Sequence, residues 1–450
     1  MKKLNRRWEF IAEKNKGKEV YIMETSRKSL TVVIVLSLFA LLINISEGSA
    51  KPTLERGIIK IGVAGPLKKS FGMAILRGAE MATKEINDAG GVLGSQIRLF
   101  PADSEGTAPK ATEVIEKLYY ADKVDVIVGA YTSEEGTAFQ EQSAKLKINT
   151  LYHGTAHMLD KKFKSDPEKY KYSWTYVVSD LHGAEYALSH QYELLISSIK
   201  KQVGLEKVNV AVISDMALWT EGFHAKNMDY IKRRPDCNLV YVGRTGRDAV
   251  DFTAELTELR AKDVQLIIFT TGFSAGYSFV KQAHDIRIPS MITGTNLLSW
   301  SIDDFIKAVG IDAAAYNSTN CFMTLPTTPH TATLIETYKK VYGGHPLLDV
   351  GLAYNGVKAY LKAVEGARSL DHGKVQKAIE KLRLPEGETW GCKEFRFDDN
   401  HRVHVSPTDG LIFFTYQFTS SGGANILHPP EYKKGDIVVP PWVIKRWKKE

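Results

Sequence analysis

The chain has 450 residues, of which 44% are hydrophobic and 25% are charged, and it contains 16 prolines. This composition indicates a folded globular protein of two or three domains, or one large two-lobed unit, and it excludes collagenous, disordered and polytopic membrane proteins. The formal charge is +7, but outside residues 1–50 the chain has 50 basic against 47 acidic residues. Because so neutral a body has no broad positive field, we expect no nucleic-acid partner.

Neither a metal nor an organic cofactor is predicted. Cys237, Cys321 and Cys392 lie far apart without a CxxC pair, so no zinc site is indicated and at most one disulfide can form. No P-loop pattern occurs in the sequence. The glycine-rich stretch 90–94 leads from a predicted helix into a predicted strand, which is the reverse of a dinucleotide-binding fingerprint.

The N-terminal segment has the order of a secretory signal peptide. Arg27 and Lys28 precede an apolar run over 30–45, and small residues end at Ala50. This order predicts cleavage after Ala50 and export to the periplasm or the outer face of the cell membrane. The apolar run has 16 residues, short of the roughly 20 that span a bilayer, so an uncleaved anchor is the alternative. The residues before Met23 are polar, so we expect Met23 to be the true start.

After this leader, short β-branched apolar runs alternate with helical patterns. The alternation predicts βαβ units and a mainly parallel sheet. A first helix is predicted from the apolar positions Ile75, Ala79 and Ala82, and further helices open at Pro109 and Ser133. The strands predicted for this first α/β lobe cover 58–64, 96–102, 124–130 and 148–152.

A second series of strands and helices begins at Trp174 and predicts a second α/β lobe. A β-rich segment over 395–418 and a tail rich in Pro and Lys from Pro429 follow. The predicted strands cover 174–179, 208–214, 239–243, 264–271, 290–294 and 320–325, and the predicted helices cover 251–261, 331–342, 352–367 and 374–382.

The segment 272–276, Gly-Phe-Ser-Ala-Gly, matches the GxSxG pattern of serine hydrolases. It follows a predicted buried strand, as a nucleophile elbow does. Small residues are also common in any turn from a strand to a helix, so hydrolysis by Ser274 is the less favoured alternative. The acid and base that such a reaction needs would come from Asp303, Asp304, His345, His372, His401 or His404.

His153, His157 and Asp160 are spaced by four and three residues, which invites a metal-site hypothesis. They follow a strand through Gly154 and Thr155, and no helix is predicted that would align them. We therefore favour a tight loop with hydrogen-bonded imidazoles over a metal site.

Polar residues follow two neighbouring strands of the first lobe, at 131–135 and at 153–156. The carboxyl ends of parallel strands are where open α/β sheets bind ligands. Hydroxyl and backbone N–H groups there can converge on an anion, and the helix that opens at Ser133 adds the positive end of its dipole. Ser133 is also the expected N-cap of that helix.

Five segments together carry a family pattern. They are IKIGVAGPL at 59–67, RGAE at 77–80, EINDAGGVLG at 85–94, KVDVIVG at 123–129 and DFTAEL at 251–256. In combination they resemble branched-chain amino-acid ABC transporter substrate-binding proteins, the type I periplasmic binding proteins of the Leu/Ile/Val class. The likeness covers 58–294 and resumes at 353–397.

The resemblance implies two doubly wound α/β lobes joined by a three-crossing hinge, with a ligand cleft between them. It implies an exported protein that is not an enzyme, binds a small amino acid, carboxylate or amide, and delivers it to the membrane subunits of an ABC permease. A ligand-binding sensor or regulator of the same fold is the alternative. The implied organisation is a leader at 1–50, lobe 1 at 58–174 plus 318–400, lobe 2 at 175–317 plus 401–428, and a basic tail at 429–450.

The resemblance also assigns a binding site. The loops that hold the ligand carboxylate in the family correspond to residues 132–133 and 154–155, and the lobe 2 loop at 215–222 places an indole at the cleft. The GxSxG match becomes a cleft loop rather than a nucleophile elbow. The residues implied to bind ligand are Phe71, Thr132, Ser133, Gly154, Thr155, Trp219, Gly272, Phe273 and Asn296.

Asn296 departs from the family pattern. Amino-acid binders of this family usually have an acidic residue at this position, after a Thr-Gly strand end, and it holds the α-ammonium of the ligand. Here the chain has Gly294-Thr295-Asn296. An ammonium that faces a neutral amide lacks charge compensation, so a carboxylic acid, amide or urea-like ligand is favoured over an ordinary α-amino acid.

Overall fold

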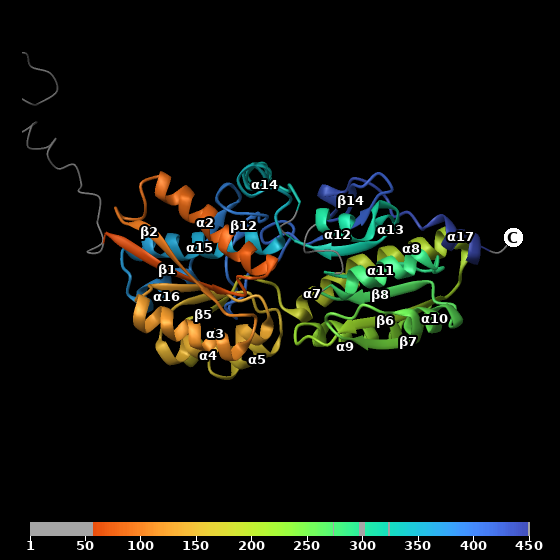
Figure 1. Ribbon diagram of the computed structural model, residues 1–450, viewed down its shortest axis with the longest axis horizontal. Helices are drawn as coiled ribbons and strands as arrows, with labels where there is room; N and C mark the ends of the chain where they lie inside the picture. The colour runs from red at the N-terminus through yellow and green to blue at the C-terminus, as the bar shows by residue number, and fades with distance from the viewer. Residues whose placement is uncertain (1–56, 273, 297–301, 323–324, 449–450) are drawn as a thin grey trace, which may run out of the picture. The chain divides into compact units, whose positions relative to one another are not determined.

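The computed structural model describes residues 57–272, 274–296, 302–322 and 325–448. These residues form one compact part of the chain with two main sheets, each flanked by helices (Figure 1). We call the part around the five-stranded sheet lobe 1 and the part around the seven-stranded sheet lobe 2. The expected leader over 1–50 lies outside the described residues.

Lobe 1 has a five-stranded sheet of order β2-β1-β3-β4-β5 in which all neighbouring strands are parallel. The central strands are apolar without alternation because helices cover both faces. The strands are β1 (Ile58–Gly65), β2 (Gln96–Asp103), β3 (Val126–Gly129), β4 (Thr150–Tyr152) and β5 (Ser173–Thr175), with a small hairpin of β11 (Leu384–Pro385) and β12 (Glu394–Phe395). The helices are α2 (Ser70–Asp88), α3 (Ala108–Lys117), α4 (Ser133–Leu146), α5 (Met158–Ser165), α6 (Pro167–Tyr170), α14 (Pro329–Tyr342), α15 (Leu348–Ala367) and α16 (His372–Glu380), with short helical turns at Leu118–Asp122 and Glu386–Glu388.

The helix α15 returns to lobe 1 from late in the sequence and lies against α2, β3 and β4. It is buried on nearly all sides, as expected for a helix without a polar face. A Cβ atom on Gly78 of α2 would lie 2.1 Å from the carbonyl oxygen of Val350. The glycine therefore allows the close approach of these two helices, and that packing fixes the start of α15 beside the ends of β3 and β4.

Lobe 2 has a seven-stranded sheet of order β14-β13-β10-β9-β8-β6-β7. Strands β6 to β10 run parallel, and β13 and β14 extend the sheet as antiparallel strands. The strands are β6 (Val208–Asp215), β7 (Cys237–Thr245), β8 (Leu266–Thr270), β9 (Met291–Thr295), β10 (Ser318–Cys321), β13 (Phe414–Phe418) and β14 (Ala424–His428). The helices are α7 (Asp180–Tyr186), α8 (Glu193–Ile199), α9 (Thr220–Arg233), α10 (Thr253–Ala261), α11 (Ala275–Asp285), α12 (Ile302–Val309), α13 (Ile311–Ala314) and α17 (Pro441–Trp447), with short helical turns at Ala187–Tyr192, Lys200–Gly204 and Pro430–Tyr432.

The chain passes between the lobes three times: after β5, after β10 and between β12 and β13. The first and third passages lie side by side, because Thr175 N–H donates to His401 O at 2.8 Å and Val403 N–H donates to Thr175 O at 2.9 Å. The predicted fold class, two α/β lobes joined by three crossings, is confirmed.

Three details differ from the sequence predictions. The strand predicted over 174–179 ends at Thr175, because the chain leaves the sheet there to cross to lobe 2. Residues 318–321, assigned above to lobe 1, form β10 and pair with β9 and β13 of lobe 2. The tail is folded against lobe 2: Trp442 Nε1–H donates to Ile288 O at 3.1 Å, and Val443 is fully buried.

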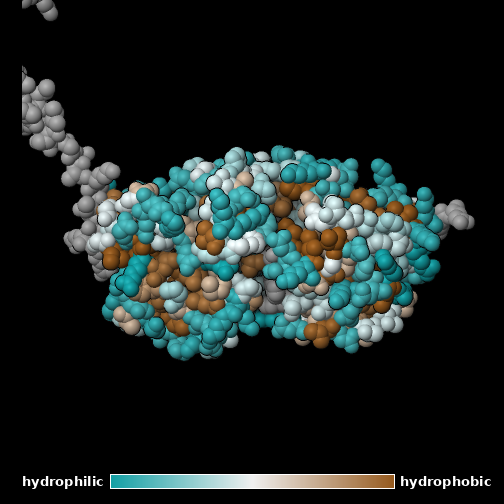
Figure 2. Space-filling view, turned by 45° about the horizontal axis from the view of Figure 1, so that its top comes forward, coloured by the Kyte–Doolittle hydropathy of each residue, from teal (hydrophilic) through white to brown (hydrophobic). Residues whose placement is uncertain are grey.

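The surface is mostly hydrophilic on the face in Figure 2, with smaller areas of apolar residues between the polar ones. Among the described residues, no helix combines the length and the apolar character that crossing a bilayer requires.

Candidate functional site

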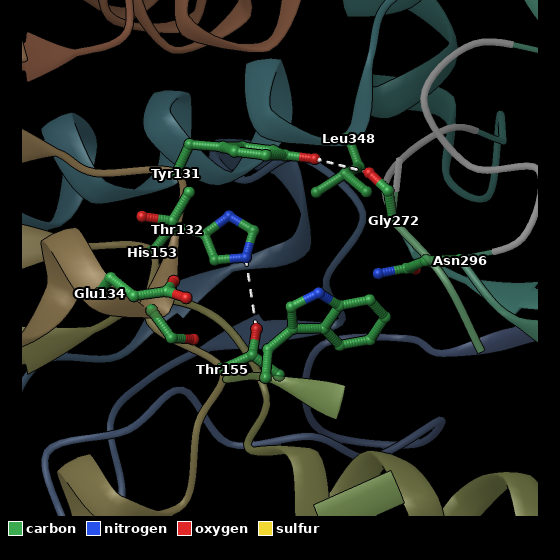
Figure 3. Close-up of a pocket in the computed structure, with 10 residues that line it drawn as sticks. Tyr131, Thr132, Glu134, His153, Thr155, Gly272, Asn296 and Leu348 are labelled. Carbon is green, nitrogen blue, oxygen red and sulfur yellow. Dashed lines mark hydrogen bonds between the residues drawn. The ribbon is translucent and has the colours of Figure 1, made fainter. Parts of the chain in front are cut away.

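A pocket lies where loops of the two lobes meet, and it holds about 440 Å³ of empty space with its open mouth included (Figure 3). Apart from Leu348 at the start of α15, the lining residues follow the carboxyl ends of parallel strands, where α/β sheets bind ligands. Lobe 1 contributes Tyr131, Thr132, Ser133, Glu134, His153, Thr155 and Leu348, and lobe 2 contributes Trp219, Gly272 and Asn296.

Six of the nine residues named from the sequence line this pocket: Thr132, Ser133, Thr155, Trp219, Gly272 and Asn296. Phe71 is not among the lining residues but stacks on the lining residue Tyr131, at 3.9 Å between ring centroids. Gly154 is packed away from the pocket: a Cβ atom there would lie 2.5 Å from Leu159 Cδ1. Phe273 lies outside the described residues.

Four residues that line the pocket are not among the nine named from the sequence. Tyr131 and Glu134 stand in the loop already singled out after β3, so their position was a usable signal. His153 stands in the loop singled out after β4, and it was also considered as a metal ligand. Leu348 carried no local signal, because it reaches the pocket through the packing of α15 across the sheet.

The loop before α4 is fixed by the buried Glu135. Its carboxylate accepts hydrogen bonds from the N–H groups of Tyr131 and Thr132, both at 3.0 Å, and Thr132 Oγ1 accepts from Glu135 N–H at 3.1 Å. Thr132 is therefore the N-cap of α4, and the expectation that Ser133 caps this helix is wrong. Burial raises the pKa of Glu135 above its ordinary value.

Ser133 instead joins the two strand-end loops. Its Oγ accepts a hydrogen bond from Ala156 N–H at 3.0 Å, which leaves the hydroxyl hydrogen of Ser133 available for another acceptor. Ser133 begins α4, a helix of 14 residues, so the positive end of this helix lies at the pocket. The two loops are thus held together at a point suited to a negatively charged group.

His153 is held between two oxygen atoms. Its Nδ1 lies 2.8 Å from Asp349 Oδ1. Its Nε2 lies 3.3 Å from Thr155 Oγ1, as Figure 3 shows. Asp349 lies on α15 and is only 2% exposed. The pocket wall therefore contains a continuous hydroxyl–imidazole–carboxylate chain.

The metal-site hypothesis finds no support in the contacts of its three residues. His157 Nδ1 lies 2.8 Å from Asp180 Oδ2, and Asp160 pairs with Arg402. The three side chains thus have separate partners. Over the described ranges, no group of three or more His, Cys, Asp or Glu residues could hold a metal ion.

Ser274 of the GxSxG segment stands immediately before α11, and its hydroxyl donates to Asp248 Oδ1 at 3.2 Å. The two histidines proposed for it near the end of the chain have other partners: His401 stacks on Trp174 at 3.6 Å between ring centroids, and His404 lies 3.3 Å from Asp409. The hydroxyl of Ser274 therefore contacts a carboxylate rather than a base arranged as in a catalytic triad.

The lobe 2 wall is organised by Asp215 at the end of β6. Its carboxylate accepts from Ala217 N–H at 3.1 Å and from Gly272 N–H at 3.2 Å, and burial raises its pKa to about 6. A Cβ atom on Gly272 would lie 3.1 Å from Trp219 Cζ2. The glycine therefore lets the indole pack against its loop. Asn296 follows β9 with a left-handed φ of 57°, which asparagine tolerates well.

Comparison with known proteins agrees with this architecture. The family model described as periplasmic binding protein matches residues 59–410. The chain belongs to this family. The family resemblance found in the sequence is thereby confirmed, and the family and fold are those of solute-binding proteins, which are not enzymes.

Individual proteins similar to this periplasmic binding protein agree with the family assignment. The Leu/Ile/Val-binding protein homolog 7 of Brucella suis is 25% identical over 397 residues, which cover 84% of this chain and 93% of that protein. LivJ, the branched-chain amino acid transporter substrate binding protein of Streptococcus pneumoniae, solved with isoleucine, is similar in fold with a TM-score of 0.67, at 20% identity over 83% of this chain and 100% of that one. An ABC transporter solute binding protein of R. palustris, solved with benzoate, has a TM-score of 0.65, at 16% identity over 86% of this chain and 98% of that one.

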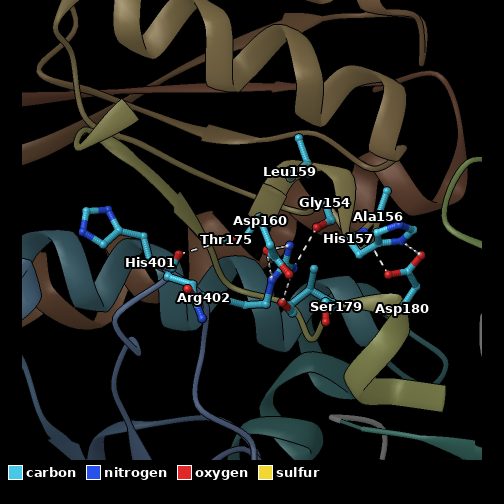
Figure 4. A network of polar contacts seen from close by, with 12 residues as sticks. Gly154, Ala156, His157, Leu159, Asp160, Thr175, Ser179, Asp180, His401 and Arg402 are labelled. Atoms are coloured by element: carbon cyan, nitrogen blue, oxygen red, sulfur yellow. Dashed lines mark hydrogen bonds and ion pairs between the residues drawn. The ribbon is translucent and has the colours of Figure 1, made fainter. Parts of the chain in front are cut away.

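The hinge of this binding protein is fastened by Arg402, which is 1% exposed (Figure 4). Its Nε donates to Asp160 Oδ1 at 2.7 Å, and its Nη1 donates to Gly154 O and Val177 O, both at 2.9 Å. The guanidinium thus joins the third crossing to the first crossing and to the loop after β4. Gly154 therefore contributes to the hinge rather than to the pocket wall.

Several polar contacts join the two lobes of this periplasmic binding protein. Tyr131 Oη donates to Gly272 O at 3.3 Å, and Arg247 of lobe 2 forms an ion pair with Glu134 of lobe 1. Asp180 at the start of α7 accepts from His157 N–H at 2.8 Å and from Gly222 N–H at 3.1 Å. These contacts describe a closed arrangement of the two lobes.

Proposed function

We propose that this protein is an exported solute-binding protein of an ABC importer. It binds a small amino acid or a related carboxylate or amide between its lobes and delivers it to the permease subunits in the membrane. The observation that carries the proposal is the pocket, which both lobes line at the carboxyl ends of their parallel strands. Binding stabilises the closed state only as far as the ligand contacts both lobes at once.

A carboxylate is the chemical group that the lobe 1 side suits best. Ser133 and Thr155 present hydroxyl groups, and the N-terminus of α4 adds a partial positive charge. Isoleucine and benzoate, the ligands of the two related structures, share a carboxylate group. We assign this group of the ligand to the Ser133 and Thr155 loops.

The remainder of the ligand faces Trp219, Leu348 and the amide of Asn296. Among the described residues that line the pocket, Glu134 is the one with a carboxylate side chain. Its ion pair with Arg247 already neutralises that charge. A buried ammonium without an opposite charge is unfavourable. We therefore place amine-free acids and amides above leucine, isoleucine and valine in affinity.

The test is native mass spectrometry of freshly purified protein, followed by a thermal-shift screen. The panel comprises leucine, isoleucine, valine, 4-methylpentanoate, benzoate and isobutyramide. A ligand at 100 times its dissociation constant stabilises the folded protein by about 2.7 kcal/mol. The proposal is supported when an acid or amide of the panel binds and raises the melting temperature. It fails if no small molecule copurifies and no member of the panel shifts the transition.

Export is proposed from the order of charged, apolar and small residues at the N-terminus. The protein recovered from the cell envelope should begin after Ala50. N-terminal sequencing that found residue 23 or an earlier residue would exclude cleavage and leave the anchored form.

A further inference from the structure

Thr155, His153 and Asp349 form a series of two hydrogen bonds in the pocket wall. The position of each hydrogen atom in this series depends on the protonation state of His153. An ionised carboxylate only accepts hydrogen bonds, so His153 Nδ1 must carry the hydrogen that Asp349 accepts at 2.8 Å. In a neutral imidazole, Nε2 then has only a lone pair. In this neutral form the hydroxyl of Thr155, at 3.3 Å, is placed to donate its hydrogen to Nε2.

This arrangement has a consequence for an anionic ligand. With its hydrogen directed to His153, Thr155 Oγ1 offers the pocket only lone pairs. A ligand carboxylate also offers only lone pairs, so the two oxygen atoms would repel each other and neither would be satisfied. When His153 is neutral, Thr155 therefore disfavours a ligand carboxylate, although Ser133 and the N-terminus of α4 favour one.

We propose that this protein binds carboxylate ligands together with one proton, which His153 takes up. The inference rests on the proposed function, since it requires a carboxylate at the Thr155 loop. The proton comes from solvent and is placed on Nε2, and no covalent bond to the ligand forms. Nε2–H then donates to Thr155 Oγ1, and the hydroxyl of Thr155 turns its own hydrogen to the ligand.

A bound carboxylate would add to the negative charge that already faces His153. Asp349 already faces one side of the ring, and the ligand carboxylate brings a second negative charge to the other side. Arg247 neutralises Glu134, the charged group that shares the pocket lining with His153. Among the described residues, two titratable groups contact this ring: Asp349 on α15 and Tyr131 before α4. Glu134 on α4 shares the pocket lining with it, and Arg247 of lobe 2 pairs with Glu134. Tyr176 after β5 contacts the backbone of His153, and Glu135 on α4 acts on Tyr176.

Proton coupling makes the pocket selective for net charge. A monoanion binds with its proton as a neutral pair, whereas a zwitterionic amino acid adds an ammonium that the imidazolium repels. Where His153 is neutral in the free protein and protonated in the complex, the affinity for a monoanion falls about tenfold for each unit of pH increase. The affinity for an uncharged amide has no such dependence.

The test is isothermal titration calorimetry with 4-methylpentanoate as the probe and isobutyramide as the uncharged comparison. Titrations in phosphate and in Tris at pH 7.5 differ in buffer ionisation enthalpy, so the difference in measured heat gives the number of protons taken up. We expect up to one proton per 4-methylpentanoate and none per isobutyramide. A second series between pH 6 and 8.5 should show weakening of the acid as the pH rises.

Two variants make the assignment specific. In His153→Gln the amide cannot titrate, so proton uptake and the pH slope should disappear. In Asp349→Asn the imidazole remains but loses the neighbouring negative charge that favours its protonated form. The number of protons taken up per 4-methylpentanoate should therefore be lower than in the wild type. His182→Gln removes an exposed histidine on α7 and should leave both readouts unchanged.

The outcomes separate the inference from the proposed function. Binding of 4-methylpentanoate without proton uptake and with a flat pH profile would overturn the role of His153 while the solute-binding function stands. Uptake that persists in His153→Gln would assign the proton to another group and would also overturn it. Absence of binding by both probes and by the whole thermal-shift panel would overturn the proposed function itself.

Discussion

The hydroxyl of Tyr131 on lobe 1 donates a hydrogen bond of 3.3 Å to the carbonyl oxygen of Gly272 on lobe 2. Phe71 stacks on the Tyr131 ring and fixes its position, while Asp215 accepts from Gly272 N–H and fixes the loop on the other side. The bond exists only where the lobes meet. It therefore favours closure and, through closure, affinity for the ligand.

Removing this hydroxyl in Tyr131→Phe should weaken ligand binding by about 0.5 to 1.5 kcal/mol, the net contribution of one hydrogen bond. Calorimetry with a ligand found in the thermal-shift panel measures the loss. The control is Tyr342→Phe, which removes a hydroxyl that donates to Glu80 at 2.9 Å within lobe 1. Equal affinities of the two variants would show that the contact does not contribute to closure.

Ser133→Ala should weaken binding of an anionic ligand by roughly 1 to 3 kcal/mol. The change removes a hydroxyl donor from the pocket, and it also deprives Ala156 N–H of the oxygen that accepts from it at 3.0 Å. Ser197→Ala, at an exposed position of α8, is the matched control. Unchanged calorimetric affinity in Ser133→Ala would remove this hydroxyl from the binding site.

Asn296→Asp should improve leucine relative to 4-methylpentanoate, because a close negative charge favours the ammonium group. The left-handed φ of 57° at this position suits aspartate as well as asparagine, so the backbone should not move. Asn238→Asp on the exposed side of β7 introduces the same charge away from the pocket. If the ratio of the two dissociation constants stays the same in Asn296→Asp, another residue governs recognition of the amine.

Arg402→Met should lower the free energy of unfolding by about 3 to 5 kcal/mol, because it leaves a partly buried carboxylate and two carbonyl groups without their partner. Urea denaturation measures the difference. Arg383→Met is the control, since Arg383 pairs with Glu394 while its side chain is 64% exposed. An exposed pair contributes about 1 kcal/mol or less, so similar losses in both variants would contradict the structural role of Arg402.

Asp215 should make the protein less stable as the pH rises from about 4 to about 6. Its pKa is raised from 3.8 in the unfolded reference to about 6 by burial, so in this range the folded state binds more protons than the unfolded state. The accumulated loss is about 3 kcal/mol at neutral pH. In Asp215→Asn, the free energy of unfolding measured between pH 4 and 7 should not show this loss. Asp312→Asn, at an exposed position, should show the same loss as the wild type. Parallel pH profiles of wild type and Asp215→Asn would refute the assignment.

The sequence predicted those site residues that directly follow neighbouring parallel strands. Thr132, Ser133 and Thr155 follow strands β3 and β4, which are neighbours in the sheet and end at the same edge. Gly154 was named for the same reason but faces the hinge, because Leu159 fills the space beside it. A position directly after a strand predicts that a residue lies near the pocket. It does not predict whether the residue faces the pocket or the hinge.

The sequence by itself determined the two α/β lobes, the family and most of the pocket wall, since these follow from local hydrophobic periodicity and from short segments of adjacent residues. Only the tertiary structure decided what depends on contacts between distant segments. The packing of α15 against α2 brings Leu348 and Asp349 close to His153. Arg402 in the third crossing joins the first crossing and the loop after β4. Because such contacts join residues separated by 190 or more positions, no local pattern encodes them, and the environment of the imidazole in the pocket arises only when the lobe is assembled.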